Sequence, residues 1–231
     1  MDANRELWNA RQKLLVEALT KRIDHARAVD LFMTQHAMLH APGPGDVGGW
    51  SFDEELWQNL PEDRARWLPP GGEHSIAWMI WHIARCEDIT FNLLVARGPQ
   101  VIDQDGWVAK MRSSVYDTGN AMDTAAVIKF SAEIDLAALR TYRMAVGQRT
   151  REIVRGLPAG DFQRPVASSD IQRIKDADAV AEGAEYLLDY WGKQKVAGLL
   201  LMPATRHLLV HLNEAMRIKA KRNITGNPPA G

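Results

Sequence analysis

Two histidines one helical turn apart are the first residues in this sequence that could do chemistry. His207 and His211 are separated by Leu-Leu-Val in a segment that predicts a helix. Four residues of helix advance about 400°, so both imidazoles leave one face roughly 6 Å apart and can bind a single metal ion. Glu214 lies on the same stripe and could be a further ligand, or could orient an imidazole by accepting its second N–H. Such pairs also occur by chance, so the spacing alone does not define a metal site.

A third histidine, His82, lies in the most hydrophobic segment of the chain, SIAWMIWHIARCEDITFNLLVA, residues 75–96. A histidine there is buried and needs a partner for each ring nitrogen, so it is either a metal ligand or a core residue bonded to a carbonyl group. Cys86, one turn along, could join a metal site or could fill space in the core. Trp78 and Trp81 could wall a substrate pocket, although core packing is the commoner role.

The remaining four histidines are interpreted differently. His36 and His40 form a second pair with four-residue spacing, at the end of the first helical segment. They could line the same cavity as His82, or they could lie at the surface or at the helix terminus. His25 and His74 are interpreted as structural residues.

Four long helical segments are predicted to position these residues. Apolar side chains recur in them every three or four residues. The segments cover residues 3–40, 75–96, 123–156 and 203–222. The first is either one helix or two with a break near Lys21, and Ser75 fits the position that caps the second.

The long helices are joined by long connections, over about 41–74 and 97–122. Shorter helical segments are predicted over 53–59 and 178–193, and strand patterns are scarce. The sequence therefore predicts an all-α fold: a four-helix bundle with long crossover connections and an additional short helix.

The composition indicates a single globular domain over residues 1–231, with a basic and flexible tail at about 219–231. The formal net charge is −1, and no stretch approaches about eighteen apolar residues without a charge. Neither nucleic acid nor a membrane is therefore expected as a partner. Cys86 is the only cysteine, and the N-terminal segment lacks the apolar core of a signal peptide, so we expect a cytoplasmic protein.

Two other patterns do not indicate a function. Residues 43–48 satisfy G-x-G-x-x-G, but no strand is predicted before them and no helix opens on them, so they are interpreted as a loop. The Glu-x-x-His repeats that a di-iron bundle needs are missing from the sequence. Their absence excludes the nearest other all-α metalloprotein.

The two blocks that contain the histidines resemble the DinB-like superfamily of four-helix bundles. The blocks are HSIAWMIWHIARCED, with His82, and PATRHLLVHLNEAMRIK, with His207 and His211. The family pattern has one histidine in the second helix and a His-xxx-His pair in the last, so the resemblance implies that these three histidines hold one divalent metal ion. The chain departs from the common pattern at Val210, where a histidine next to His211 is usual, and at Asn213, which replaces a glycine.

The resemblance also implies the chemistry of the site. Three neutral imidazoles leave an ion its full charge and open coordination positions, and nickel or zinc suits such ligands better than magnesium or calcium. The ion would activate a water molecule or a thiol as a nucleophile. Members of the superfamily resemble metal-dependent hydrolases, transferases that use low-molecular-weight thiols such as bacillithiol or mycothiol, and a maleylpyruvate isomerase.

We therefore expect a metal-dependent enzyme that performs hydrolysis on a small molecule, or S-transfer with a low-molecular-weight thiol as cosubstrate. Glu214 is expected to orient an imidazole or to accept a proton. A homodimer is expected from the resemblance alone. The alternatives are a non-catalytic metal-containing bundle that acts as a binding or dimerisation module, and simple metal sequestration.

Overall fold

The segments with helical periodicity fold as helices in the computed structural model, which describes residues 3–21, 24–42 and 49–221. In these ranges the only β-type pairing is an isolated antiparallel bridge between Pro165 and Lys195. The predicted all-α class is therefore confirmed.

A helix that is buried on every side forms the centre of the bundle. α5, Ile76–Ile89, is capped by the Ser75 hydroxyl, which accepts a hydrogen bond from Trp78 N at 3.0 Å, and all its residues are buried. It packs against α8, Leu136–Arg155, and α12, His207–Ala220. A helix that is apolar nearly all round belongs in the interior, as the sequence predicted for this segment.

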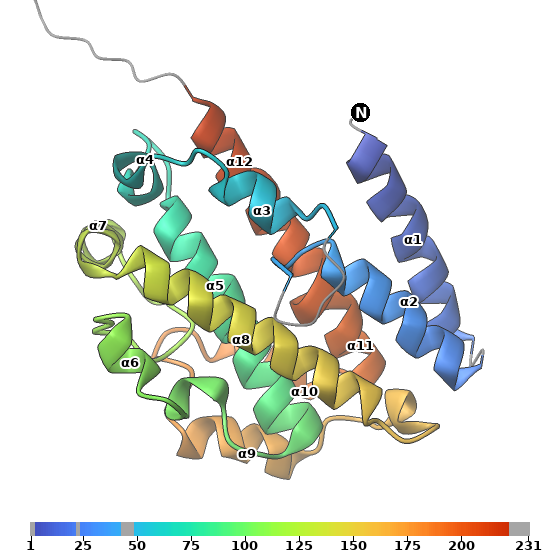
Figure 1. Cartoon of the computed structure of the whole chain (residues 1–231). Helices are drawn as coiled ribbons and strands as arrows, with labels where there is room; N and C mark the ends of the chain where they lie inside the picture. The colour runs from blue at the N-terminus through green and yellow to red at the C-terminus, as the bar shows by residue number, and fades with distance from the viewer. Residues whose placement is uncertain (1–2, 22–23, 43–48, 222–231) are drawn as a thin grey trace, which may run out of the picture.

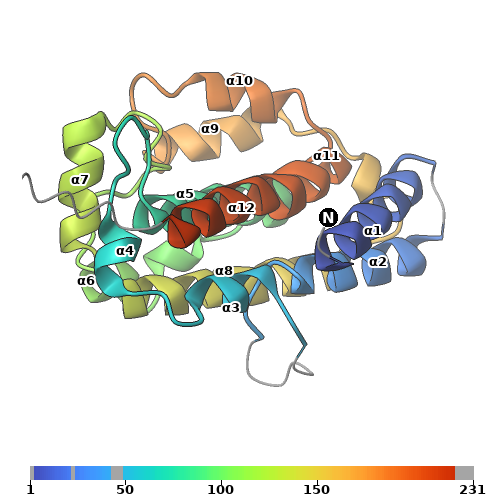
Figure 2. The ribbon, with the colours of Figure 1, turned by 90° about the horizontal axis from the view of Figure 1, so that it is seen from above.

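Shorter helices and the N-terminal pair surround this centre. Their bounds are α1 Ala3–Thr20, α2 His25–Ala37, α3 Phe52–Trp57, α4 Glu62–Arg66, α6 Trp107–Lys110, α7 Thr124–Glu133, α9 Ser168–Asp176, α10 Tyr186–Gly192 and α11 Val196–Leu201. Figure 1 shows α5, α8 and α12 running along one another. Figure 2 shows α5 and α12 in the middle, with α9 and α10 on one side and α8 on the other.

The first predicted segment is two helices, with the break near Lys21 that the sequence left open. α1 ends at Thr20, and α2 begins at His25. The Asp24 side chain caps α2 by accepting a hydrogen bond from Ala26 N at 2.8 Å. The cap fixes where the second helix begins.

The third predicted helix, over 123–156, is wrong as a single element, because the chain divides into α7 and α8. Ile134 has an extended backbone with ψ of 137°, and Asp135 caps α8 by accepting a hydrogen bond from Ala138 N at 3.0 Å. An aspartate side chain competes with the helix for backbone N–H groups. Here that competition ends one helix and starts the next.

The last predicted helix begins earlier than Pro203. α11 leads into a π-helical segment, Met202–Arg206, and this leads directly into α12. Proline has no N–H to donate. Pro203 stands at the start of the π-helical segment, where a helix tolerates a missing N–H, and the Thr205 hydroxyl donates to the carbonyl groups of Leu200 and Leu201, both at 2.9 Å.

Short helices lie between the long ones. α3 lies where a helical turn was predicted over 53–59, and α10 lies within the predicted segment 178–193. Three further short helices, α4, α6 and α9, were not predicted from the sequence. Helices this short span too few turns to show hydrophobic periodicity.

The connection over 97–122 is bound to α5 by two buried charges. Asp88 accepts hydrogen bonds from Val101 N at 2.8 Å and Ile102 N at 3.0 Å. Arg85 donates from Nη1 to Asp88 at 2.9 Å and from Nε to the Tyr116 carbonyl at 2.8 Å. Each charge is therefore paired and hydrogen-bonded, as burial requires.

The predicted tail begins inside α12. Lys219 is helical, and its Nζ donates to the carbonyl groups of Glu55 at 2.7 Å and Gln58 at 2.6 Å. Lys219, near which the tail was predicted to begin, therefore belongs to α12, and residues 222–231 and the predicted loop over 43–48 lie outside the described residues.

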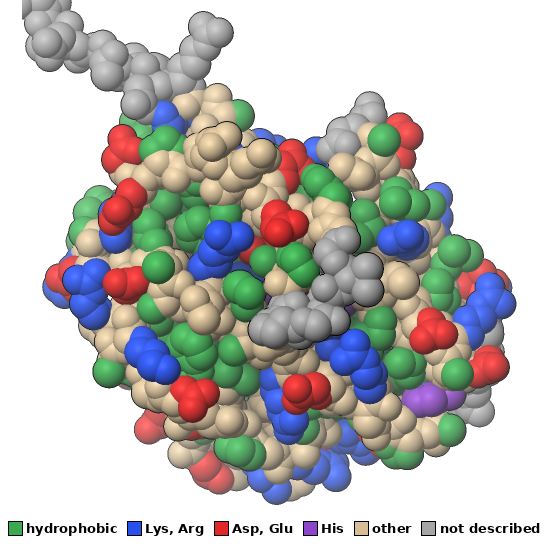
Figure 3. Space-filling model, viewed as in Figure 1, with side chains coloured by type: hydrophobic (Ala, Val, Ile, Leu, Met, Phe, Trp, Pro, Cys, Tyr) green, Lys and Arg blue, Asp and Glu red, His purple; other side chains and the backbone are tan. Residues whose placement is uncertain are grey.

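The visible surface carries both signs of charge. Acidic and basic side chains are interspersed on the face in Figure 3, in keeping with the formal net charge of −1. No helix in the described part of the chain is long and apolar enough to cross a membrane.

Candidate metal centre

The three histidines singled out from the sequence lie next to one another between α5 and α12. His82 is in the middle of α5, His207 is the first residue of α12, and His211 is one turn further along. Their ring centroids are 4.9 Å apart for His82 and His207, 5.0 Å for His82 and His211, and 4.8 Å for His207 and His211. The ring planes stand at 74–86° to one another, so no two of the three rings are stacked.

The hydrogen bonding of His82 decides which of its nitrogens is free for a metal. Nδ1 is 2.8 Å from the Thr118 carbonyl oxygen, which can only accept, so Nδ1 carries the proton and Nε2 has a lone pair. His82 Nε2 is 3.1 Å from His207 Nε2. Two nitrogens bound to one tetrahedral ion at about 2.0–2.1 Å are roughly 3.3 Å apart. The spacing of these nitrogens therefore suits a shared ion.

The Thr118 carbonyl is itself held in place by α5. Trp81 Nε1 donates to the Asp117 carbonyl at 3.0 Å, and Arg85 Nε donates to the Tyr116 carbonyl. Three consecutive carbonyl groups thus accept hydrogen bonds from one helix, and His82 makes the third. The ring orientation of His82 is therefore set by a rigid neighbour.

Burial keeps all three imidazoles neutral. Loss of hydration lowers the pKa of His82 to about 3 and that of His211 to about 4, and lowers the pKa of His207 well below its ordinary value. Neutral imidazole is the form that binds a metal ion.

Glu214 lies beside the third imidazole. Its Oε2 is 3.5 Å from His211 Nδ1, a nitrogen that has no hydrogen-bond partner among the described residues. The carboxylate is close enough to attract an Nδ1 proton, which would leave Nε2 of His211 as the donor toward a metal.

Cys86 is a fourth possible ligand, because its sulfur and one ring nitrogen each of His82 and His207 all lie within 4.8 Å of one another. Its sulfur is 3.9 Å from both Nδ1 and Nε2 of His82. Because the sulfur is equally far from both nitrogens of His82, it lies on the plane that bisects the ring between them. A metal ion bound to Nε2 would lie along the lone pair of Nε2, to one side of that plane. Burial also raises the pKa of the Cys86 thiol to about 12, so it is neutral at pH 7.

A cavity of about 560 Å³ opens onto the three histidines. Trp78 forms part of its wall and is stacked between His74, with ring centroids 3.7 Å apart, and His82, at 4.7 Å. His74, interpreted as structural from the sequence, thus lines the cavity. Trp81 is not among the lining residues and packs against Phe130 in the core.

A second cluster of possible ligands lies between α2 and α5, and its hydrogen bonding argues against a metal. His36 Nε2 is 2.7 Å from Glu87 Oε1, and His40 Nε2 is 3.0 Å from Glu87 Oε2. Arg143 Nη1 donates to His40 Nδ1 at 3.0 Å, so that nitrogen is unprotonated and Nε2 carries the proton. His40 therefore donates to the carboxylate and has no lone pair for a metal.

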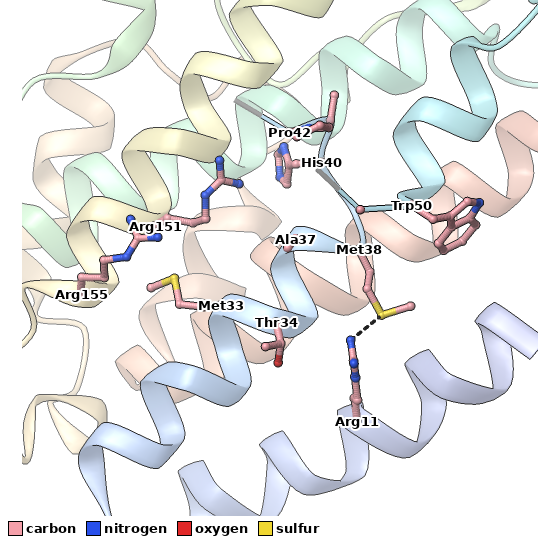
Figure 4. Close-up of a pocket in the computed structure, with 12 residues that line it drawn as sticks. Arg11, Met33, Thr34, Ala37, Met38, His40, Pro42, Trp50, Arg151 and Arg155 are labelled. Carbon is pink, nitrogen blue, oxygen red and sulfur yellow. Dashed lines mark hydrogen bonds between the residues drawn. The ribbon is translucent and has the colours of Figure 1, made fainter. Parts of the chain in front are cut away.

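The same bonds explain the charge on Glu87. Burial alone would raise its pKa, but His40 and His36 hold the pKa of this carboxyl well below its ordinary value. His40 lines a different cavity, of about 310 Å³, where Figure 4 shows it together with Arg151 and Arg155. Neither His36 nor His40 lines the described wall of the cavity at His82.

Comparison with known proteins bears on this arrangement. A model of the DinB superfamily matches residues 54–215, a range that includes α5 and the part of α12 that carries both of its histidines. The chain belongs to the DinB superfamily. The superfamily often binds metal, and the predicted membership is confirmed. Comparison with curated proteins gave no match. In this DinB-superfamily chain α1 and α2 precede the matched range.

Some residues around the site could not be found from the sequence. Thr118 contributes its backbone carbonyl, and a backbone group has no residue-type signal. Asn120 and Tyr186 line the cavity from the 97–122 connection and α10, far apart in the sequence. His74 precedes the cap of the helix that carries His82, but it stands four residues before Trp78 and eight before His82, and this spacing could have placed it on the same face.

Proposed function

We propose that this DinB-superfamily chain is a metal-dependent enzyme that binds one divalent transition-metal ion, nickel or zinc, through His82, His207 and His211. The supporting observation is the adjacency of three buried imidazoles, whose ring centroids are 4.8–5.0 Å apart, with His82 Nε2 unprotonated and 3.1 Å from His207 Nε2. The proposed reaction is hydrolysis or S-transfer on a small molecule.

An ion at this position would supply Lewis-acid activation of a water molecule or a thiol. The nucleophile in this proposal comes from outside the chain, because Cys86, the only cysteine, is buried, and burial raises the pKa of its thiol in the metal-free protein. The three histidines serve as neutral donors, and Glu214 serves as a positioning residue that orients His211.

The cavity favours an enzyme over a closed structural metal site. Structural zinc sites have four protein ligands, whereas catalytic sites have three and an open position. Here Cys86 Sγ lies within 4.8 Å of a ring nitrogen of His82 and of His207 and is the fourth candidate, but it is 3.9 Å from both nitrogens of His82, away from the side on which Nε2 would bind an ion. The cavity volume of about 560 Å³ falls in the range of small-molecule sites, roughly 300–1,000 Å³. Both features support substrate access to the ion.

Metal analysis of the purified full-length protein tests the proposal. His82→Ala, His207→Ala and His211→Ala should each lower the metal-to-protein ratio well below that of the wild type, while His25→Ala should not. His25 is a matched control, since it lies outside the cavity and is bonded to the Leu157 carbonyl. An unchanged ratio in all three variants would eliminate the site.

A second measurement separates the enzyme from the non-catalytic module. In cobalt- or nickel-substituted protein, azide or a small thiol should shift the visible spectrum, because an open coordination position can accept a ligand. A spectrum that does not respond indicates a closed site and favours the binding or dimerisation module. Thiols are then screened against electrophiles to distinguish S-transfer from hydrolysis.

A further inference from the structure

A second cavity lies apart from the metal site. Its volume is about 310 Å³, at the lower end of the range for small-molecule sites, roughly 300–1,000 Å³. Side chains of α1, α2 and α8 line it, together with residues of the connection between α2 and α3. It shares no described lining residue with the cavity at the three histidines, so a ligand in it would be held by a different set of side chains.

The described wall of this second cavity carries positive charge and no negative charge. Arg11, Arg151 and Arg155 are among its lining residues, whereas no aspartate or glutamate is. His40 adds no charge, because burial lowers its pKa well below the ordinary value of 6.5. The formal net charge of the whole chain is only −1, so the positive charge is a local feature, and it favours an anionic ligand.

Two of these arginines have hydrogen-bond donors that the described residues do not use. A guanidinium group has five N–H donors. Arg155 is exposed and makes no hydrogen bond or ion pair with any described residue. Arg11 is half-buried, and its one bond in the described structure runs from Nη1 to Met38 Sδ at 3.5 Å. A thioether is a weak acceptor, so both groups can still bind a carboxylate, whose two oxygens fit the guanidinium fork.

The same two arginines lie at opposite ends of the cavity. Figure 4 shows Arg155 on α8 at one end and Arg11 on α1 at the other, with Ala37 of α2 between them. Met33 lines the cavity one turn before Ala37, so part of the wall between the two charges is apolar. A ligand that contacts both arginines must therefore be elongated, and an apolar middle would suit this wall.

We infer that this cavity binds an unbranched dicarboxylate. One carboxylate accepts hydrogen bonds from Arg155 and the other from Arg11, while the methylene chain lies along Met33 and Ala37. Each carboxylate then gains a basic partner as it loses hydration, which a monocarboxylate does at one end only. The inference goes beyond the proposed function, because it concerns a separate site and needs no metal ion.

A matched pair of acids tests the inference. Suberate and octanoate have the same number of carbon atoms and differ in the second carboxylate. Each is titrated by calorimetry, at fixed ionic strength, into the full-length chain from which metal has been removed. Suberate should bind at least about fivefold more tightly, because it makes a second set of charge-assisted hydrogen bonds. Equal affinities, or tighter binding of octanoate, overturn the inference.

Chain length separates a bridging ligand from a general attraction of negative charge. Succinate is too short to contact both ends of an elongated site, so its advantage over butyrate should be smaller than that of suberate over octanoate. The same advantage at both lengths would mean that the second charge acts without a specific partner, and the bridging site would be wrong.

Charge variants locate the site. Arg11→Gln and Arg155→Gln should each reduce the affinity for suberate to about that for octanoate, since each removes one of the two carboxylate partners. Arg27→Gln is the matched control: Arg27 is exposed on α2, outside the lining residues, and the substitution changes the net charge by the same amount. It should leave the affinity for suberate unaltered. If all three variants weaken suberate equally, the effect does not arise in this cavity and the inference fails.

A zinc titration of the same samples keeps the two proposals apart. Arg11→Gln and Arg155→Gln should take up zinc at the wild-type ratio, because neither residue lines the metal cavity. If the wild type takes up no zinc, the proposed metal-dependent function fails, while the calorimetry still decides the dicarboxylate site. If zinc binds and suberate is not preferred, the metal site stands and the dicarboxylate site is wrong.

Discussion

Cys86 lines the same cavity as the three histidines, yet its sulfur does not lie along the lone pair of His82 Nε2. Cys86→Ser should therefore leave the metal-to-protein ratio unchanged. A thiolate ligand gives cobalt a sulfur-to-metal charge-transfer band in the near-ultraviolet. Cobalt-substituted wild-type protein should lack this band. Loss of metal in Cys86→Ser, or such a band in the wild type, would show that the thiol turns to coordinate the ion.

Glu214 should tune metal binding without being a ligand. Its carboxylate is 41% exposed and 3.5 Å from His211 Nδ1, so its hold on the ring is weaker than that of a buried partner. Glu214→Gln should lower the affinity for zinc by about tenfold. This is the small end of the roughly 10–100-fold range that is found when a group that orients a metal ligand is removed. Competition with a chromophoric chelator measures this, and a complete loss of zinc would instead make Glu214 a ligand.

The buried histidines also make stability depend on pH. Folding lowers the pKa of His82 to about 3 and of His211 to about 4, from the ordinary value of 6.5, so below pH 6.5 the unfolded chain binds more protons than the folded chain. The free energy of unfolding of the metal-free protein should fall as the pH drops from 6.5 toward 4, by up to roughly 1.4 kcal/mol per pH unit for each histidine.

Denaturant unfolding at pH 7, 6 and 5 measures this slope. His211→Asn removes one titrating group, so its curve should be flatter over the same range. If its slope equals that of the wild type, His211 is not held neutral by the fold.

At the scale of residues, the adjacency of the three histidines could be predicted from the sequence and their surroundings could not. The spacing of His207 and His211 places both on one helical face, and an apolar segment around His82 implies burial. The proton position on His82 depends on the Thr118 carbonyl, which is brought near by a connection without periodicity. Only the tertiary structure shows that His40 bonds to Arg143 and so differs from His82.

At the scale of elements, α5 positions the site by holding the connection that faces it. Trp81→Phe removes the hydrogen bond to the Asp117 carbonyl and keeps most of the ring. It should lower the free energy of unfolding by about 1 kcal/mol and weaken zinc binding severalfold, because the neighbouring Thr118 carbonyl is then less fixed.

Trp107→Phe is the matched control for this prediction. Trp107 is buried in the same hydrophobic cluster as Trp81, but its Nε1 has no hydrogen-bond partner in the described structure. The substitution removes a similar volume without removing a bond, so zinc affinity should stay at the wild-type value. If both variants weaken zinc equally, the effect comes from core packing.

The errors of element prediction share a physical cause. Asp135 and Pro203 each lie within a longer stretch of apolar periodicity, and each residue type can interrupt a helix. Asp135 starts a new helix, since its side chain accepts a hydrogen bond from Ala138 N, whereas Pro203 ends none, since it stands at the start of a π-helical segment, where a missing N–H is tolerated. The outcome in each case depends on local backbone hydrogen bonding, which apolar periodicity does not register.

At the scale of the whole molecule, the two polar clusters along α5 have different roles. His82 belongs to the proposed metal site, whereas Glu87, one turn and a half later, joins α5 to α2 through His36 and His40. The single domain, the homodimer and the cytoplasmic location stay predictions, and light scattering of the purified protein would check the dimer.

Gly147 provides a test of this division. A Cβ at Gly147 in α8 would lie 2.4 Å from His40 Nδ1, where Arg143 now donates its hydrogen bond. Alanine normally stabilises a helix relative to glycine, by roughly 0.5–1 kcal/mol, but overpacking costs about 1–3 kcal/mol and breaks the bond to His40 as well. Gly147→Ala should therefore destabilise the protein and lower its Tm.

Gly156→Ala is the matched comparison, because the nearest atoms to its added Cβ are backbone oxygens at 3.6 Å, an ordinary contact distance. Its Tm should stay close to that of the wild type. Both variants should still bind zinc at the wild-type ratio below their melting temperatures, because His40 donates to Glu87 and not to a metal. If Gly147→Ala loses zinc while its Tm is unchanged, the two clusters form one functional unit, and the assignment of His36, His40 and Glu87 to structure is wrong.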